Sequence, residues 1–233
     1  MSISCIVPAR NEAGHLADVI GQVMLVSQIS KIFIVEGGSS DHTQAEATRL
    51  AEASGGFIEL LVQTGTGKFN AVLEGAAKCS SEFILIWDAD GTVSLADTQK
   101  IVEVALERRV GVIGNRLKGK MEKGAMQYAN YFANWAFAIL WAPYTNRKPI
   151  DLLCGTKIFP REVFTKLPHK VRDVDPYGDF TLIASAAINK IEIVSIPVNY
   201  SKRKYGVTNI KRWRGGIQLL RTYTRFVWEY EKS

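Results

Sequence analysis

The sequence predicts an α/β fold in which a mostly parallel sheet is flanked by helices. Along the first half of the chain, strand-length apolar runs alternate with segments of helical length, as in strand–helix–strand units with right-handed crossovers. The runs are almost continuously apolar, which is typical of strands buried on both faces. Because 47% of the 233 residues are apolar, the chain can form a sizeable core, and we expect one domain over residues 1–233.

The expected elements follow one another from the N-terminus. Strands are expected at residues 3–7, 31–35, 57–63 and 83–87. Helices are expected at residues 15–26, in two segments that end near residues 53 and 78, and at residues 213–230. Ser39, Ser40 or Asp41 could cap the helix that ends near residue 53, because such side chains accept hydrogen bonds from N–H groups at a helix start.

Composition narrows the function without deciding it. The formal charge of +6 suits a phosphate-bearing substrate, an anionic membrane surface or nucleic acid. The three cysteines and three histidines are scattered, so neither a zinc site nor a histidine triad is expected. Neither a leader peptide nor a membrane span of about 18 to 20 apolar residues is expected. These observations predict a protein of the reducing cytoplasm.

Two carboxylates follow the fourth expected strand. Asp88 and Asp90 come directly after residues 83–87, and Gly91 follows them. Ligands of open α/β sheets bind beyond the carboxyl ends of the strands. Two carboxylates one residue apart can hold one hard divalent cation, with substrate phosphates completing its shell. An acidic turn that only closes the strand is the open alternative, whereas an EF-hand loop is excluded because Gly91 comes too early.

A glycine-rich turn at residues 65–68 precedes the helix that ends near residue 78. It is not a P-loop, because Val62 stands where that motif requires its first glycine. Lys68 in this turn can approach an anionic ligand. A plain strand-to-helix turn is an equally open interpretation.

Four strand-end motifs occur in a fixed order in the first half of the chain. They are IVPARNE (residues 6–12), IVEGGSSDHT (34–43), GTGK (65–68) and WDADG (87–91). In this order they resemble family 2 glycosyltransferases, which have the Rossmann-like GT-A fold. Motifs of the second half extend the resemblance to dolichyl- and polyprenyl-phosphate sugar synthases: GNR (114–116), EKGAM (122–126), CGTK (154–157), YGDF (177–180), IPVNY (196–200) and RKYG (203–206).

The resemblance implies a nucleotide-sugar half at residues 1–115 and an acceptor half at residues 116–233. It assigns Mg²⁺ or Mn²⁺ to Asp88 and Asp90. Arg10 replaces a tyrosine that is common in the family, and Glu36 replaces the usual aspartate. The positions implied in nucleotide-sugar binding are Pro8, Arg10, Glu12, Ile34, Glu36, Lys68, Asp88, Ala89, Asp90 and Arg116.

The resemblance also implies phosphate contacts in the acceptor half. Arg116 and Arg203 would bind phosphates, and Lys211 could replace a family lysine that is absent at Asn209. Thr92 stands where polyprenyl relatives often offer a glutamine to the metal. Asp179 is the matching general base for a hydroxyl acceptor. With a phosphate acceptor, which is already an anion, Asp179 could merely orient the site, and it could also cap a helix from about residue 181.

The last expected helix carries a basic stripe. Arg214, Arg221 and Arg225 are spaced by seven and four residues, beside an apolar sector formed by Trp213, Ile217, Leu220, Val227 and Trp228. This pattern suits a helix at an anionic lipid surface, or a helix packed on the sheet with its arginines in water. Aromatic residues at 128, 132 and 135 have near-helical spacing with Ile139, and we expect this segment to belong to the core.

Taken together, the residues and the resemblance predict an inverting, metal-dependent glycosyltransferase. It would move a hexose from a nucleotide-diphosphate sugar to polyprenyl or dolichyl phosphate. Binding to the inner face of a membrane would then bring it to its acceptor. A family 2 transferase with a soluble sugar or protein acceptor is the alternative, and a basic nucleic-acid-binding module is disfavoured by the intact acidic pair.

Overall fold

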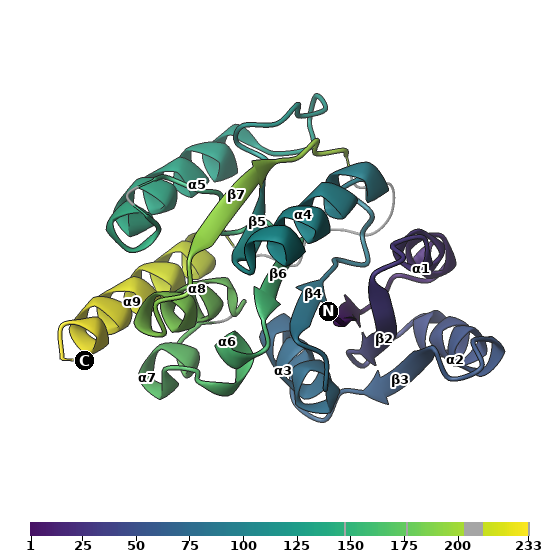
Figure 1. Ribbon diagram of the computed structural model, residues 1–233. Coiled ribbons are helices and arrows are strands. Elements are labelled where there is room, and N and C mark those ends of the chain that lie inside the picture. Colours follow the sequence, from purple (N-terminus) through teal and green to yellow (C-terminus); the bar gives the residue numbers. More distant parts are fainter. Residues whose placement is uncertain (147, 176, 203–211, 233) are drawn as a thin grey trace.

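A seven-stranded sheet forms the centre of the molecule (Figure 1). A computed structural model describes residues 1–146, 148–175, 177–202 and 212–232, with the backbone alone at residues 212–214. The strand order is β3-β2-β1-β4-β6-β5-β7. The strands are β1 (Ile3–Ala9), β2 (Ile29–Glu36), β3 (Ile58–Val62), β4 (Phe83–Ile86), β5 (Gly111–Asn115), β6 (Lys157–Pro160) and β7 (Ile193–Pro197).

Strand β6 runs against its neighbours. It pairs antiparallel with both β4 and β5, whereas the other strand pairs of the sheet are parallel. Its first residue, Lys157, is therefore paired with Ile86 at the carboxyl end of β4 and with Ile113 near that of β5. The reversed strand brings the loop before it to the edge of the sheet where the parallel strands end.

Helices flank the sheet, and the predicted α/β architecture is confirmed (Figure 1). Helix α2 packs on β2 and β3, α3 on β1 and β2, and α4 on β5, β6 and β7. No helix of the described ranges is both long and apolar enough to cross a membrane. The helices are α1 (Leu16–Met24), α2 (Thr43–Ala53), α3 (Lys68–Lys78), α4 (Leu95–Arg108), α5 (Tyr128–Trp141), η1 (Ala142–Tyr144), α6 (Glu162–Thr165), α7 (His169–Arg172), α8 (Asp179–Ile188) and α9 (Arg212–Tyr230).

Aromatic rings join α5 to α9 at one end of the molecule (Figure 1). The ring of Trp141 stacks on that of Phe226, with 4.6 Å between centroids, and the edge of Tyr144 meets the same ring at 4.7 Å. The remainder of α5 differs from our expectation of a core segment. Tyr128, Phe132 and Ile139 are 86%, 69% and 62% exposed, so the described part of the chain does not cover this face of the helix.

Helix α9 begins within one residue of its predicted start, but the residues that it buries are not those of the expected apolar sector. Leu219 and Phe226 are buried against the helices beneath them, and α9 contacts α7 and α8. The apolar residues Ile217, Leu220 and Trp228 instead point outward, and Arg221 and Arg225 are exposed as well. The helix thus packs on other helices and keeps a mixed apolar and basic surface on its outer side.

A carboxylate from α2 holds the start of α1. Glu46 is buried and accepts hydrogen bonds from the N–H groups of Gly14 and Ala17, each at 2.9 Å. Among the cap candidates for α2, Asp41 accepts from the N–H of Thr43, although the capping position itself is His42. Free N–H groups at a helix start need such acceptors. The loop that carries residues 10–13 is thereby fixed to α2.

We expect Glu46→Ala to destabilise the fold. The substitution leaves two N–H groups at the start of α1 without their acceptor, which costs about 1–3 kcal/mol in the free energy of unfolding. Urea unfolding followed by circular dichroism measures this change. Glu52→Ala, at an exposed position of the same helix, is the matched control and should change stability little. Equal stability of both variants would contradict the proposed cap.

Candidate active site

The predicted acidic pair lies where β4 ends. Trp87 is buried, and the half-buried Asp88 and Asp90 follow it on either side of the buried Ala89. One carboxylate oxygen of Asp90 accepts hydrogen bonds from the N–H and the hydroxyl of Thr92, at 3.2 and 2.9 Å. Thr92 therefore orients the carboxylate of Asp90.

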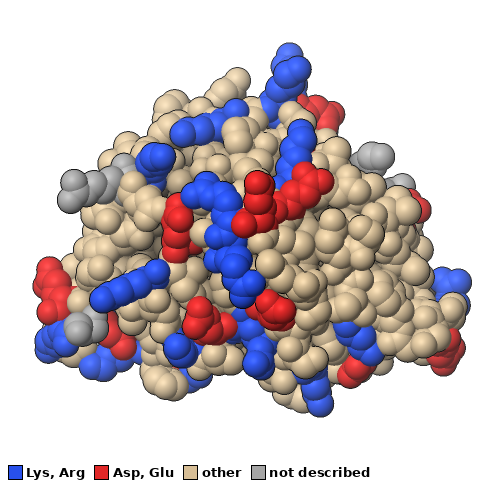
Figure 2. All heavy atoms as spheres, in the orientation of Figure 1, with Lys and Arg blue, Asp and Glu red and all other residues tan. Residues whose placement is uncertain are grey.

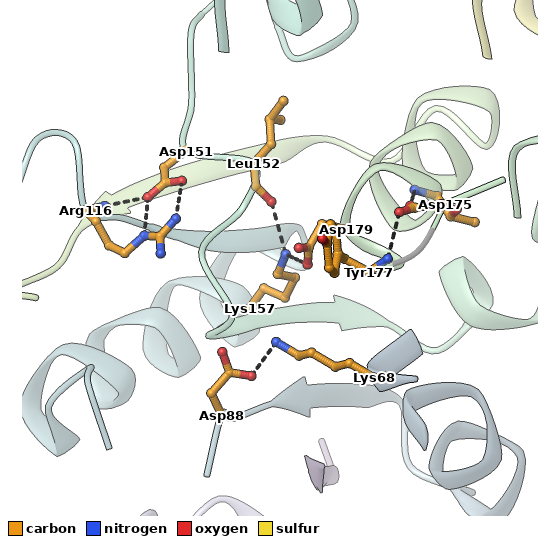
Figure 3. A network of polar contacts seen from close by, with 10 residues as sticks. Lys68, Asp88, Arg116, Asp151, Leu152, Lys157, Asp175, Tyr177 and Asp179 are labelled. Carbon is orange, nitrogen blue, oxygen red and sulfur yellow. Dashed lines mark hydrogen bonds and ion pairs between the residues drawn. The ribbon is translucent and has the colours of Figure 1, made fainter. Parts of the chain in front are cut away.

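A lysine from the glycine-rich turn contacts the first carboxylate (Figure 3). Lys68 is the first residue of α3, and its ammonium lies 2.5 Å from Asp88 Oδ1. Burial alone would raise the pKa of Asp88, but Lys68, Lys157 and Arg116 outweigh it and hold the pKa below its ordinary value. Burial would lower the pKa of Lys68, but Asp88, Asp179 and Asp90 raise it above its ordinary value. Both groups are therefore charged at neutral pH.

Gly155 allows the loop before β6 to touch Asp88. A Cβ atom at Gly155 would lie only 1.6 Å from Asp88 Oδ2, which is too close for two atoms that are not bonded to each other. The CGTK motif therefore needs glycine here because its backbone lies directly against the carboxylate. A substitution at this position must displace either Asp88 or the loop.

A second lysine, which our sequence analysis did not single out, pairs with Asp179 (Figure 3). Lys157 Nζ lies 2.6 Å from Asp179 Oδ1 and also donates to the carbonyl of Leu152 at 3.2 Å. The alternative in which Asp179 caps a helix from about residue 181 is wrong, because Asp179 is itself the first residue of α8. Asp175 instead accepts from the N–H and hydroxyl of Thr181, at 2.8 and 2.9 Å.

Arg116 is engaged within the protein. Its Nε and Nη2 donate to the two oxygens of the fully buried Asp151, at 2.6 and 2.9 Å, and its N–H donates to the same carboxylate. The guanidinium also lies 5.0 Å from the ring centroid of Tyr200. This bidentate pair fixes the residues after β5 to the loop before β6. In this arrangement Arg116 braces the site, and a phosphate contact would have to use the three N–H groups of the guanidinium that do not bind Asp151.

The positions expected to hold the nucleotide lie at the ends of β1 and β2. Pro8 is half-buried, Arg10 is exposed, and the Glu12 carboxylate lies 2.8 Å from His15 Nε2. Glu36 is buried and accepts from the N–H of Ser39 at 2.6 Å. Ile34 has no exposed surface, so its side chain belongs to the core and does not face an open pocket.

The expected phosphate ligands Arg203 and Lys211 lie outside the described residues. The chain just before them is fixed close to the acidic pair. Tyr200 forms bridges with Val93 and Met121. Burial raises the pKa of Tyr200, and the neighbouring charge of Asp90 adds to this rise. Tyr200, close to the last described residue before Arg203, therefore lies beside the site.

The chemistry of the acidic pair fits a hard divalent cation. Asp88 and Asp90 offer carboxylate oxygens at one strand end, and Asp88 already holds a cationic group in Lys68. Within the described ranges, no group of three or more His, Cys, Asp or Glu side chains could hold a metal. An ion between these two aspartates would therefore take further ligands from a bound diphosphate and from water.

Comparison with known proteins identifies the family. Residues 4–167 match the profile of glycosyl transferase family 2. The chain belongs to glycosyl transferase family 2. The glycosyltransferase AglJ of Haloferax volcanii is 31% identical to it over 228 residues, which are 96% of this chain and 72% of that protein. The dolichyl-phosphate β-glucosyltransferase of Saccharomyces cerevisiae is 22% identical, with 90% of this chain and 71% of that protein covered.

Solved structures confirm the GT-A fold of this family 2 glycosyltransferase. Glucosyl-3-phosphoglycerate synthase from Mycobacterium tuberculosis, in complex with Mn²⁺, UDP and glucosyl-3-phosphoglycerate, superposes with a TM-score of 0.68. The two sequences are 17% identical, and the alignment covers 97% of this chain and 80% of that chain. The same synthase has also been solved with Mg²⁺ and UDP.

We expect Gly155→Ala to disable the transferase without unfolding it. Because the added methyl group collides with Asp88, either the carboxylate or the loop before β6 must move, and a misplacement of about 1 Å costs about 10²-fold in turnover. Steady-state transfer assays and thermal melting measure the two effects separately. Gly21→Ala on α1, where nothing lies within 4 Å of the added atom, is the control and should keep full activity. Wild-type turnover in Gly155→Ala would contradict the close contact.

Proposed function

We propose that the protein is an inverting hexosyltransferase that uses a nucleotide-diphosphate sugar and transfers the sugar to polyprenyl or dolichyl phosphate. Residues 1–115 would bind the donor, and residues 116–233 would bind the acceptor. The observation that carries this proposal is the convergence of Asp88, Asp90 and Lys68 at the carboxyl end of β4. Ligands of α/β sheets bind at this position.

The donor half supplies the groups that a leaving diphosphate requires. Asp88 and Asp90 would hold Mg²⁺ or Mn²⁺, which when bound stabilises the diphosphate as a Lewis acid. With a cation bound to Asp88, the ammonium of Lys68 would be available to face a phosphate oxygen. The residues at the ends of β1 and β2, among them Pro8, Arg10 and Glu36, would line the nucleotide.

The acceptor half would place a phosphate oxygen behind the anomeric carbon. Attack from that side forms the new C–O bond while the bond to the nucleoside diphosphate breaks, so the configuration at the carbon inverts. Arg203 and Lys211 are the proposed ligands of the acceptor phosphate. Arg116, braced by Asp151 and 5.0 Å from the ring centroid of Tyr200, would keep the segment that leads to them beside the donor.

The outer surfaces of α5 and α9 support a lipid-linked acceptor. Tyr128, Phe132 and Ile139 on α5 are exposed, and so are Ile217, Leu220 and Trp228 on α9. The ammonium groups of Lys170 and Lys232 lie 4.0 and 3.7 Å from the centroid of the Trp228 ring. Exposed apolar side chains framed by cations suit the surface of an anionic membrane. Peripheral docking through this face would bring the site to a polyprenyl phosphate.

Other functions have less support. A soluble acceptor is the main alternative, because a synthase that uses phosphoglycerate shares the fold. A nucleic-acid-binding module would need a broad basic surface. Figure 2 shows basic side chains interspersed with acidic ones over the face it displays. The acidic pair also has no use in such a module.

Donor and acceptor screening tests the proposed function. Thermal shifts with UDP-, GDP- and dTDP-sugars in the presence of Mn²⁺ identify the nucleotide, since a ligand at 100 times its dissociation constant adds about 2.7 kcal/mol of stability. Transfer of the labelled sugar is then measured to polyprenyl phosphate and to soluble hydroxyl acceptors. Transfer to a soluble acceptor, with none to polyprenyl phosphate, would overturn the proposal.

We expect Asp90→Asn to lower turnover by about 10²–10³-fold, because the variant loses one charge that holds the cation against the leaving group. Binding of Mn²⁺, followed by electron paramagnetic resonance, should weaken in parallel while the melting temperature stays near that of the wild type. Asp18→Asn, at an exposed position of α1, is the control. Full activity of Asp90→Asn, or unchanged affinity for Mn²⁺, would rule out the metal role.

We expect the protein to sediment with vesicles that contain anionic lipid. Replacing Arg221 and Arg225 by glutamine should weaken binding about fivefold per residue at low salt and little at high salt, because salt screens the charges. Phe132→Ser should weaken binding at both salt concentrations, because its contribution is apolar. Arg49→Gln/Lys78→Gln, which removes two exposed charges elsewhere, is the control. Equal binding of all variants would contradict docking through α5 and α9.

A further inference from the structure

The pair formed by Lys157 and Asp179 is an ion pair inside the protein. Lys157 is 1% exposed, and its ammonium has two contacts in the described structure, the carboxylate of Asp179 and the carbonyl of Leu152. Asp179 is buried as well. Removing two charges from water is costly, and removing one partner of such a pair leaves the other uncompensated. The fold therefore keeps this pair despite an unfavourable desolvation cost.

The pair lies beside the reacting groups without contacting the expected metal ligands. Antiparallel β6 pairs Lys157 with Ile86, two residues before Asp88. Burial is the largest single influence on the pKa of Asp88, which it raises, and on that of Lys68, which it lowers. The charge of Lys157 acts against burial by lowering the pKa of Asp88, and the charge of Asp179 does so by raising the pKa of Lys68. Figure 3 shows Lys157 and Asp179 together next to Asp88 and Lys68.

For Asp179 to act as a base, Lys157 would lose its counter-ion. A hydroxyl acceptor loses a proton as its oxygen bonds to the anomeric carbon, and a carboxylate that took this proton would become neutral. The ammonium of Lys157 would then remain buried against a neutral partner, which is unfavourable. A phosphate acceptor brings an oxygen that is already ionised near neutral pH, so the new C–O bond forms without any proton transfer.

We propose that Lys157 is a positioning residue that keeps Asp179 as a fixed counter-charge, so that Asp179 does not act as a base when the phosphate oxygen of the acceptor attacks. This inference rests on the proposed function and assigns the roles of these two residues in it. Asp179 then fixes Lys157 and, through the bond from Lys157 to Leu152, the loop before β6. It takes no proton during transfer.

The first test is the Asp179→Asn variant, assayed with polyprenyl phosphate. We expect kcat to fall less than about tenfold, because no proton transfer is lost. A general base would cost about 10²–10⁴-fold in kcat with the acceptor KM unchanged. The melting temperature shows whether the variant is folded, and Asp173→Asn at an exposed position is the control. A folded Asp179→Asn enzyme with a loss of 10²-fold or more overturns the inference.

A second pair of variants separates positioning from simple stability. Lys157→Met should lower both the melting temperature and kcat, because Asp179 is left buried without its partner. Lys157→Met/Asp179→Leu should restore the melting temperature and most of kcat, since an apolar pair often replaces a buried ion pair without loss. Wild-type kcat in folded Lys157→Met would show that Lys157 positions nothing. A folded but inactive double variant would show that the Asp179 carboxylate itself is required.

Assays of the wild-type enzyme distinguish an error in this inference from an error in the proposed function. If the wild type transfers sugar to polyprenyl phosphate but folded Asp179→Asn does not, the inference falls and the proposed function stands. If the wild type transfers only to hydroxyl acceptors, the proposed acceptor is wrong, and the inference falls with it.

Discussion

The site depends on balancing charges that the fold has partly removed from water. Burial opposes the charged forms of both Asp88 and Lys68, and both remain charged only because opposite charges lie within contact. Asp88 alone would tend to take up a proton, and a protonated carboxylate cannot hold a cation. The contact with Lys68 therefore keeps the carboxylate ready for a metal. It also means that a cation must compete with an ammonium for Asp88, which favours binding of metal and diphosphate together.

The sequence was sufficient to predict the parts of this site that are local. Residues 83–87 form a buried run, so the position of Asp88 and Asp90 at a strand end follows from hydrophobicity alone. The two lysine contacts do not follow in this way. Lys157 reaches the site only because β6 inserts antiparallel between β4 and β5, an arrangement made some 70 residues after the acidic pair in the chain. Non-local strand order leaves no periodic signal in the residues themselves.

The helices show a related limit. The spacing of aromatic residues in α5 correctly indicates a helix, but it does not tell which face finds a partner. Trp141 is buried, with Phe226 of α9 stacked on it, whereas Phe132 on the same helix meets the ring of its neighbour Tyr131 and remains 69% exposed. A contact with a helix more than 80 residues away decides burial here. Exposed apolar groups in a folded domain commonly mark a surface for another partner, so the failed expectation of a core segment is itself informative about function.

Two glycines show how the first half of the chain, residues 1–115, is fixed to the second half. Gly155 lies against Asp88, and at Gly178 an added Cβ would lie 1.9 Å from Phe69. Gly178 has a φ of +81°, a conformation that L side chains rarely adopt, so both space and backbone require glycine there. Phe69 follows Lys68 at the start of α3, and Gly178 precedes Asp179 at the start of α8. The two helix starts that carry these charged groups are therefore in direct contact, so the close packing of Gly178 on Phe69 fixes the start of α8 to the helix whose first residue, Lys68, contacts Asp88.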